Sequence, residues 1–222
     1  CALSGCFALS GGCGLSGPVK FIWTHDAFRV GEDGPTHEPV EQEAQIRLME
    51  KLKNHSGKDS VRVFRPADAD ETTVCWKLAM ENTATPTALI LSRQGIAKLP
   101  AGNDYEQAAK GAYIVEGSDE NPDVILVASG SEVSTLVSGC ETLRKEGIKV
   151  RIVSAPSEGL FRTQNKEYQE AILPYGIKKF GMTAGLPVTL EGLVGIGPNS
   201  KIFGLSSFGF SAPYKVLDEK LG

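Results

Sequence analysis

Short apolar runs alternate along this chain with helical stripes of apolar residues. Runs rich in apolar and β-branched residues predict buried strands at residues 19–23, 60–65, 87–91, 124–128 and 148–153. Between these runs, apolar positions three or four residues apart predict helices at residues 39–54, 68–79 and 131–143. This alternation predicts an α/β fold made of two consecutive units, with parallel or mostly parallel sheets flanked by helices.

The helix predicted at residues 39–54 has a marked four-residue repeat. We expect its buried stripe to contain Val40, Ala44, Leu48 and Leu52. We expect its solvated face to contain Glu43, Arg47, Glu50 and Lys53.

The last third of the chain has weaker patterns. They predict helices at residues 167–173 and 214–221. They also predict a strand at 177–182 and another at 202–205, in addition to short strands at 112–115 and 188–190.

Two irregular segments divide the chain. Residues 1–18 are a low-complexity lead-in of Gly, Ser, Ala and Cys, in which Leu-Ser-Gly recurs every six residues. Residues 94–122 are polar and contain several Gly and Pro residues, which is typical of a linker. We therefore expect a first unit at residues 19–117, which includes much of the linker, and a second unit at 118–222.

The composition argues against two classes of partner. Of the 222 residues, 41% are apolar and 23% are charged, as in an ordinary globular protein. The net charge is −4 and the Lys and Arg residues are dispersed, so the sequence lacks the basic patch of a nucleic-acid-binding protein. No apolar run approaches the roughly 20 residues that span a bilayer. We expect neither a nucleic-acid nor a membrane partner.

The five cysteines match neither a metal-site spacing nor a small disulfide framework. Cys75 and Cys140 fall on the apolar faces of predicted helices, so we expect them to be buried, reduced thiols. A reducing, cytoplasmic location fits this usage. The first residue is not Met, and we therefore expect the chain to be a fragment.

The loop between the first strand and the first helix contains the main candidate site residues. Residues 24–39 read THDAFRVGEDGPTHEP and include His25, Asp33 and His37. Loops at the carboxyl ends of parallel strands commonly bind ligands. Imidazole can donate to a phosphate or relay a proton, and a carboxylate can accept a hydrogen bond from a substrate hydroxyl. The loop therefore suits a phosphorylated, hydroxyl-rich ligand.

Two other interpretations of this loop remain open. Its acidic residues could cap the following helix, because helix starts favour acids. Alternatively, His25, Asp33 and His37 could hold a metal ion, although their spacing is not a usual zinc spacing.

Arg93 directly follows the strand predicted at 87–91, within the tripeptide Ser92-Arg93-Gln94. In a parallel sheet this position lies at the same edge as the 24–39 loop. A guanidinium group is well suited to bidentate phosphate binding. The alternative is a surface arginine that closes a salt bridge.

The 24–39 loop resembles the pyrimidine-domain motif of transketolases, T-H-D-S-x-x-x-G-E-D-G-P-T-H-Q-P. The chain differs from this motif at Ala27 and Glu38, where the family usually has serine and glutamine. Ser92-Arg93-Gln94 and residues 206–213 resemble the family as well. The resemblance implies that residues 19–117 are part of the pyrimidine-binding domain with its linker. It also implies that residues 118–222 are the C-terminal domain without its last helix.

Transketolases use thiamine diphosphate, with Mg²⁺ or Ca²⁺, to transfer a two-carbon ketol unit from a ketose phosphate to an aldose phosphate. By resemblance, His25 and Arg93 hold the sugar phosphate and Asp33 binds a sugar hydroxyl. His37, by the same resemblance, is the catalytic candidate, because it lies near the reacting carbon and helps to transfer protons. The family's diphosphate and metal motifs are absent from this sequence, as is the glutamate that activates the cofactor. The resemblance therefore implies a homodimer or a complementing N-terminal transketolase chain, and no activity for the isolated chain.

Two other functions stay open. Deoxyxylulose-phosphate synthase, another thiamine enzyme, has a loop that resembles G-x-D-G-x-T-H, although the T-H-D and S-R-Q flanks favour transketolase. The other is a catalytically silent binding or dimerisation module, since pyrimidine domains pair across the transketolase dimer.

Overall fold

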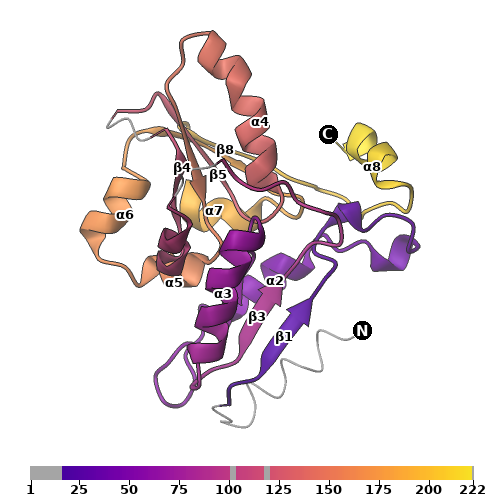
Figure 1. Ribbon diagram of the computed structural model, residues 1–222, viewed down its shortest axis with the longest axis vertical. Coiled ribbons are helices and arrows are strands. Elements are labelled where there is room, and N and C mark those ends of the chain that lie inside the picture. The colour runs from indigo at the N-terminus through magenta and orange to yellow at the C-terminus, as the bar shows by residue number, and fades with distance from the viewer. Residues whose placement is uncertain (1–16, 101–103, 118–120, 222) are drawn as a thin grey trace.

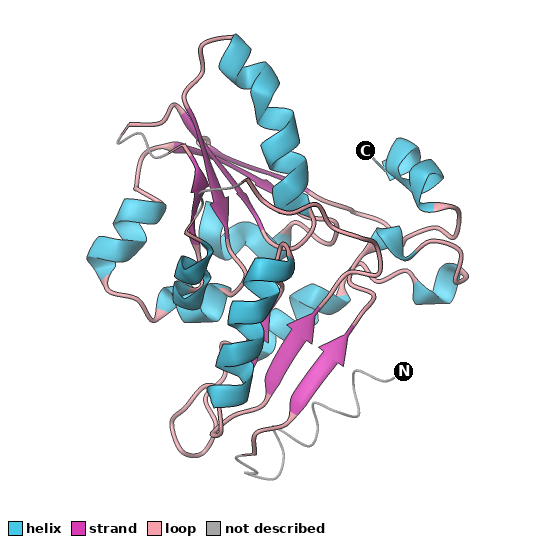
Figure 2. Ribbon diagram, viewed as in Figure 1, coloured by secondary structure: helices cyan, strands magenta, loops and turns pink. Residues whose placement is uncertain are grey.

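A computed structural model of the protein describes residues 17–100, 104–117 and 121–221 (Figure 1). Nearly all of the predicted lead-in, up to residue 16, lies outside the described residues. Within them, no helix combines the length and the apolar character needed to cross a lipid bilayer. The strands of the first unit lie in the lower part of Figure 2 and those of the second unit in the upper part.

The first unit contains a parallel three-stranded sheet in the order β1-β3-β2. Its strands are β1 (Lys20–Trp23), β2 (Arg62–Phe64) and β3 (Thr87–Ile90). Helices α2 (Gln42–Met49) and α3 (Ala69–Glu81) lie in the connections between them. The central strand β3 is buried along its whole length, as expected from its continuous apolar run.

The second unit contains a five-stranded sheet in the order β4-β6-β5-β7-β8. Strand β4 runs antiparallel to β6, and the other pairings are parallel. The strands are β4 (Tyr113–Glu116), β5 (Val124–Ala128), β6 (Val150–Ser154), β7 (Lys178–Met182) and β8 (Ser200–Phe203). The helices are α4 (Glu132–Lys145), α5 (Glu158–Arg162), α6 (Lys166–Ile172), α7 (Val188–Val194) and α8 (Tyr214–Leu221). The predicted α/β class with parallel and mostly parallel sheets is confirmed.

Helices cover both faces of the second sheet. Helix α4 packs Val133 and Leu136 against one face. Helices α5 and α7 pack Phe161 and Leu190 against the other. As predicted, Cys75 and Cys140 are buried free thiols.

The prediction of a strand at residues 188–190 is wrong, because helix α7 begins at Val188. Leu190, Leu193 and Val194 follow a helical spacing and are buried in the second unit. Three residues are too short a window to distinguish a helical period from a strand. The other predicted elements are present with shifted ends, whereas α5 and a 3₁₀ helix at Tyr105–Lys110 are not predicted.

A buried arginine joins the two units. Arg65 directly follows β2, is 1% exposed, and donates from Nη1 to the carbonyl oxygen of Ser129 at 2.7 Å. Its guanidinium group also pairs with the carboxylates of Asp26 at 2.7 Å, Glu43 at 3.6 Å and Glu132. Burial opposes the charge, but these carboxylates raise the pKa of Arg65 well above its ordinary value. We call Arg65 and its three carboxylates the Arg65 cluster.

In the helix predicted at residues 39–54, the side chains that are buried differ from those expected. Leu48 and Leu52 were expected to be buried but are 56% and 54% exposed, while the other two apolar positions of the stripe are buried. Glu43 and Arg47 were expected to be solvated but are 6% and 5% exposed. They pair with each other at 2.8 Å, and Glu43 belongs to the Arg65 cluster. The Arg65 cluster therefore favours burial of the face of α2 that carries Glu43 and Arg47.

Glu71, in the first turn of α3, is fully buried. Its carboxyl oxygens accept hydrogen bonds from the backbone N–H of Ala67 at 2.7 Å and from the hydroxyl of Tyr113 at 2.9 Å. Burial raises the pKa of Glu71 to about 7 in spite of these hydrogen bonds.

We expect the free energy of unfolding to fall as the pH rises from 5 to 8, partly because of Glu71. Its pKa in the folded state lies above the ordinary value of 4.5, so the folded state keeps a proton that the unfolded state has released. The stabilisation is complete below pH 4.5 and is lost as the pH rises through 7. A difference of roughly 2.5 pKa units corresponds to about 3 kcal/mol. Urea unfolding at both pH values measures the effect, and an unchanged pH dependence in Glu71→Gln would contradict it.

Candidate functional site

The candidate residues gather where β1 and β3 end. Trp23 of β1 pairs with Ile90 of β3 in a parallel register. The loop after β1 and the segment containing Arg93 therefore leave the sheet at the same edge, as predicted. The loop includes two 3₁₀ turns, at Phe28–Val30 and Pro35–His37.

Asp33 lies between Arg93 and His25. Its Oδ2 is 3.2 Å from Nη1 of Arg93 and 3.8 Å from Nε2 of His25. The other imidazole nitrogen of His25, Nδ1, is 2.9 Å from the hydroxyl oxygen of Thr24. The three side chains are 39–46% exposed, so a ligand from solvent can reach them. The structure thus brings His25, Asp33 and Arg93 together.

Arg93 keeps part of its guanidinium group available. Nη1 donates to the carbonyl oxygen of Val30 at 2.6 Å and faces Asp33. Nε and Nη2 of Arg93 have no hydrogen-bond partner among the residues that the structure describes. Arg93 therefore forms a salt bridge with Asp33, which was the alternative interpretation of this arginine.

His37 is exposed and is not joined to the other candidates by the contacts that the structure describes. Its Nδ1 is 3.1 Å from the hydroxyl oxygen of Thr36. In the described part of the chain it forms no hydrogen bond or ion pair with His25, Asp33 or Arg93. It is nevertheless close enough to interact electrostatically with the neighbouring Glu38, as Asp33 and Arg93 also do.

The C-terminal segment, which contains Ser211, Ala212 and Asp218, holds the 24–39 loop in place. The two are far apart in sequence, since Gly34 and Ser211 are separated by 177 positions. The backbone N–H of Gly34 donates to the hydroxyl of Ser211 at 3.0 Å, and the N–H of Ala212 donates to the carbonyl of Gly31 at 3.2 Å. Arg29 pairs with Asp218 of α8 at 2.6 Å, and Figure 1 shows α8 beside the indigo loop. Gly31 and Gly34 have φ of +102° and +85°, which favours glycine at these turns.

Sequence reasoning did not identify Asp26 as part of the site. Its carboxylate accepts from Nη2 of Arg65 at 2.7 Å and from Nε at 3.0 Å. Asp26, which is adjacent to His25, is therefore bound to Arg65 at the junction of the two units. The only signal in the sequence is its position beside a candidate histidine, since Arg65 lies 39 residues away.

Glu38 is buried beneath the C-terminal segment. It is 6% exposed, and neither carboxyl oxygen has a hydrogen-bond partner among the described residues. A Cβ added at Gly209 would lie 2.6 Å from the Cβ of Glu38, which shows how closely the segment covers it. Burial and the charge of Asp33 raise the pKa of Glu38, against the opposing charge of Arg93.

We expect Glu38→Gln to tighten the binding of inorganic phosphate by about 3-fold at pH 8. A negative charge on Glu38 interacts with Arg93, so it repels an incoming anion by a fraction of a kcal/mol where solvent around Arg93 screens the interaction. At pH 5 the effect is smaller, because the raised pKa keeps more of the wild-type carboxyl protonated. Isothermal titration measures both affinities, with Glu41→Gln as the control for a nearby loss of charge. Equal affinities for wild type and Glu38→Gln at pH 8 would contradict the expectation.

The acidic residues of the loop do not cap the following helix. Neither Pro35–His37 nor α2 has a side-chain hydrogen bond at its N-cap. Asp33 instead faces Arg93 and His25. The capping interpretation is therefore wrong for Asp33.

The described residues also lack a group that could hold a metal ion. Among them, no three or more His, Cys, Asp and Glu side chains are arranged for this purpose. The alternative of a metal site at His25, Asp33 and His37 is not supported by this arrangement.

Two family models together match most of the chain. The model of the transketolase pyrimidine-binding domain matches residues 8–98, and that of the transketolase-like C-terminal domain matches residues 111–222. The chain belongs to the transketolase family. The resemblance drawn from the 24–39 loop is thereby confirmed.

Relatives and solved structures agree with this assignment. A curated transketolase of Staphylococcus aureus (strain MW2) is 41% identical over 207 residues, covering 92% of this chain and 30% of that protein. The crystal structure of Pichia stipitis transketolase in complex with sedoheptulose-7-phosphate is 33% identical, with a TM-score of 0.82 over 98% of this chain and 30% of that chain. A split-gene transketolase, described as an inactive β4 tetramer, is 24% identical with a TM-score of 0.65, over 92% of this chain and 62% of that one. This last likeness concerns the fold alone. The chain spans about 30% of the length of the Staphylococcus aureus transketolase.

Proposed function

We propose that this chain supplies the sugar-phosphate-binding part of a transketolase. The complete enzyme would transfer a two-carbon ketol unit from a ketose phosphate to an aldose phosphate. The observation that carries the proposal is the convergence of His25, Asp33 and Arg93 at one sheet edge in a chain of this family. The Pichia stipitis relative was solved in complex with a sugar phosphate, which agrees with this ligand class.

In this proposal each residue has a distinct role. Arg93 holds the phosphate through its Nε and Nη2 edge, and His25 donates to the same group. Asp33 accepts a hydrogen bond from a sugar hydroxyl. His37 lies nearer the reacting carbon and assists proton transfer. Binding the remote phosphate positions the sugar, and this binding energy contributes to the rate of a distant bond cleavage.

Thiamine diphosphate, on which the family depends, supplies the carbanion chemistry of the complete enzyme. We infer that its diphosphate and its Mg²⁺ or Ca²⁺ are bound by a complementing N-terminal transketolase chain, because a second copy of this chain would lack the same motifs. Among the described residues, no three or more His, Cys, Asp and Glu side chains are grouped as metal ligands.

The two units correspond, in our proposal, to two transketolase domains. Residues 19–117 form part of the pyrimidine-binding domain with its linker, and residues 118–222 belong to the C-terminal domain. The spans of the two family models support this division. A cytoplasmic location stays a prediction.

Complementation tests the proposed function. The chain is mixed with an N-terminal transketolase chain, for example the corresponding part of the Staphylococcus aureus relative, together with thiamine diphosphate and Mg²⁺. We expect ketol transfer from xylulose 5-phosphate to ribose 5-phosphate by the mixture and none by either chain alone. A pyruvate-dependent product would favour deoxyxylulose-phosphate synthase. A stable assembly that binds no sugar phosphate would favour a silent dimerisation module.

A further inference from the structure

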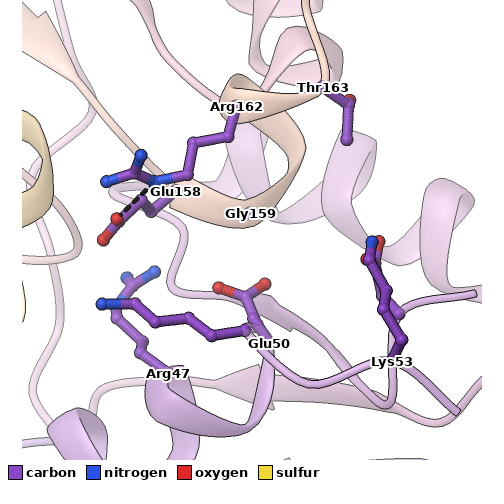
Figure 3. A pocket seen from close by; sticks show the side chains of 9 residues that line it. Arg47, Glu50, Lys53, Glu158, Gly159, Arg162 and Thr163 are labelled. Carbon is purple, nitrogen blue, oxygen red and sulfur yellow. Dashed lines mark hydrogen bonds and ion pairs between the residues drawn. The ribbon is translucent and has the colours of Figure 1, made fainter.

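A second polar cavity lies at the junction of the two units, away from the candidate site (Figure 3). Its volume is about 240 Å³. The end of α2 and the segment that follows it form one wall, and helix α5 forms the other. None of the four residues given a role in the proposed function lines this cavity.

The acidic groups of the cavity already have partners. Glu158 accepts from Nε of Arg162 at 2.7 Å, and Asp59 accepts from Nζ of Lys53 at 2.5 Å. Glu50 accepts from a backbone N–H of β2 at 2.7 Å. Burial raises the pKa of Glu50 to about 7, which disfavours its charged form. These groups therefore leave little uncompensated negative charge in the cavity.

Two cationic groups of the cavity have donors without an acceptor among the described residues. The side chain of Arg47 is 6% exposed and donates from Nε to Glu43, but its buried Nη1 has no hydrogen-bond partner among the described residues. Figure 3 shows Arg47 extending across the cavity toward Glu158. Lys51, four residues later, is exposed and forms no ion pair with any residue that the structure describes. A buried charged donor without an acceptor is unfavourable, so an anion is favoured at this position.

We propose that this cavity binds a small phosphate ester that carries hydroxyl groups. The phosphate lies between Nη1 of Arg47 and Nζ of Lys51, and a hydroxyl group donates to the carboxylate of Glu158. The cavity is smaller than the roughly 300–1,000 Å³ typical of drug-sized ligands, so the ligand is no larger than a short-chain sugar phosphate.

Ligand titrations of the Arg93→Gln variant test this site by itself. The substitution weakens phosphate binding at the candidate site, and signals beside the cavity then distinguish the two sites. The amide signals of Val63 and Gly159 report locally, since both N–H groups donate to Glu50. We expect glycerol 1-phosphate to shift both signals saturably and to bind at least 3-fold more tightly than inorganic phosphate. Glycerol alone should leave them unchanged.

A second substitution identifies the phosphate contact. Adding Lys51→Gln should weaken phosphate binding about 10-fold, because it removes a charge-assisted hydrogen bond. Adding Lys77→Gln, which changes an exposed lysine on α3, should have no effect. Thermal unfolding checks that both variants keep the fold. Equal affinities for the two variants, or unmoved amide signals, would overturn the site, and equal binding of phosphate and glycerol 1-phosphate would overturn the hydroxyl contact.

Discussion

Replacing Arg65 by methionine should lower the free energy of unfolding by about 3–5 kcal/mol, because it leaves buried carboxylates without their countercharge. The side chains of Asp26 and Glu43 are each 5% exposed and that of Glu132 is 9% exposed. Water cannot readily replace the guanidinium group at such depth. Urea unfolding at pH 7 measures the loss.

A surface ion pair is the matched control for Arg65. Arg144 pairs with Glu116 at 3.0 Å, but both side chains are about one-third exposed. Arg144→Met should therefore cost less than about 1 kcal/mol. If Arg65→Met and Arg144→Met lose the same small amount, the Arg65 cluster does not hold the two units together.

The second large effect concerns Arg93. We expect Arg93→Gln to weaken ribose 5-phosphate binding about 10- to 100-fold, because each hydrogen bond to a charged group contributes roughly 1.5–3 kcal/mol. The side chain is 41% exposed, so its loss should leave the free energy of unfolding nearly unchanged. Isothermal titration measures the affinity, and Arg144→Gln serves as the control for the loss of an arginine elsewhere.

Asp33→Asn separates phosphate binding from hydroxyl binding at the same site. The substitution removes a carboxylate 3.2 Å from Arg93, so inorganic phosphate should bind more tightly. Ribose 5-phosphate should gain less, because the amide is a weaker acceptor for a sugar hydroxyl than the carboxylate. An equal gain for both ligands would contradict the hydroxyl-binding role of Asp33.

The convergence of His25 and Arg93 follows from local patterns in the sequence. The apolar runs at 19–23 and 87–91 predict neighbouring parallel strands, and parallel strands end at a common edge. His25 and Arg93, which closely follow these runs, are therefore expected to lie near one another, whereas Asp33 lies further along the loop. This reasoning needs no knowledge of the distant parts of the chain.

The features that sequence reasoning missed depend on contacts between distant segments. The four-residue repeat of α2 favours burial of Leu48, but the pairing of Glu43 with Arg65 across the junction decides which face turns inward. The hydrogen bond between Gly34 and Ser211 joins residues 177 positions apart, for which a periodic pattern carries no information. Burial of Glu38 likewise depends on the segment that contains Gly209.

The most direct test of the central claim follows the histidine side chains by ¹⁵N NMR during a titration with ribose 5-phosphate. The chain has three histidines, and the exposed His55 lies outside the site and serves as an internal reference. The account predicts that the signals of His25 and His37 move along one saturation curve while that of His55 stays constant. Unmoved signals of His25 and His37, or parallel movement of all three, would contradict the account.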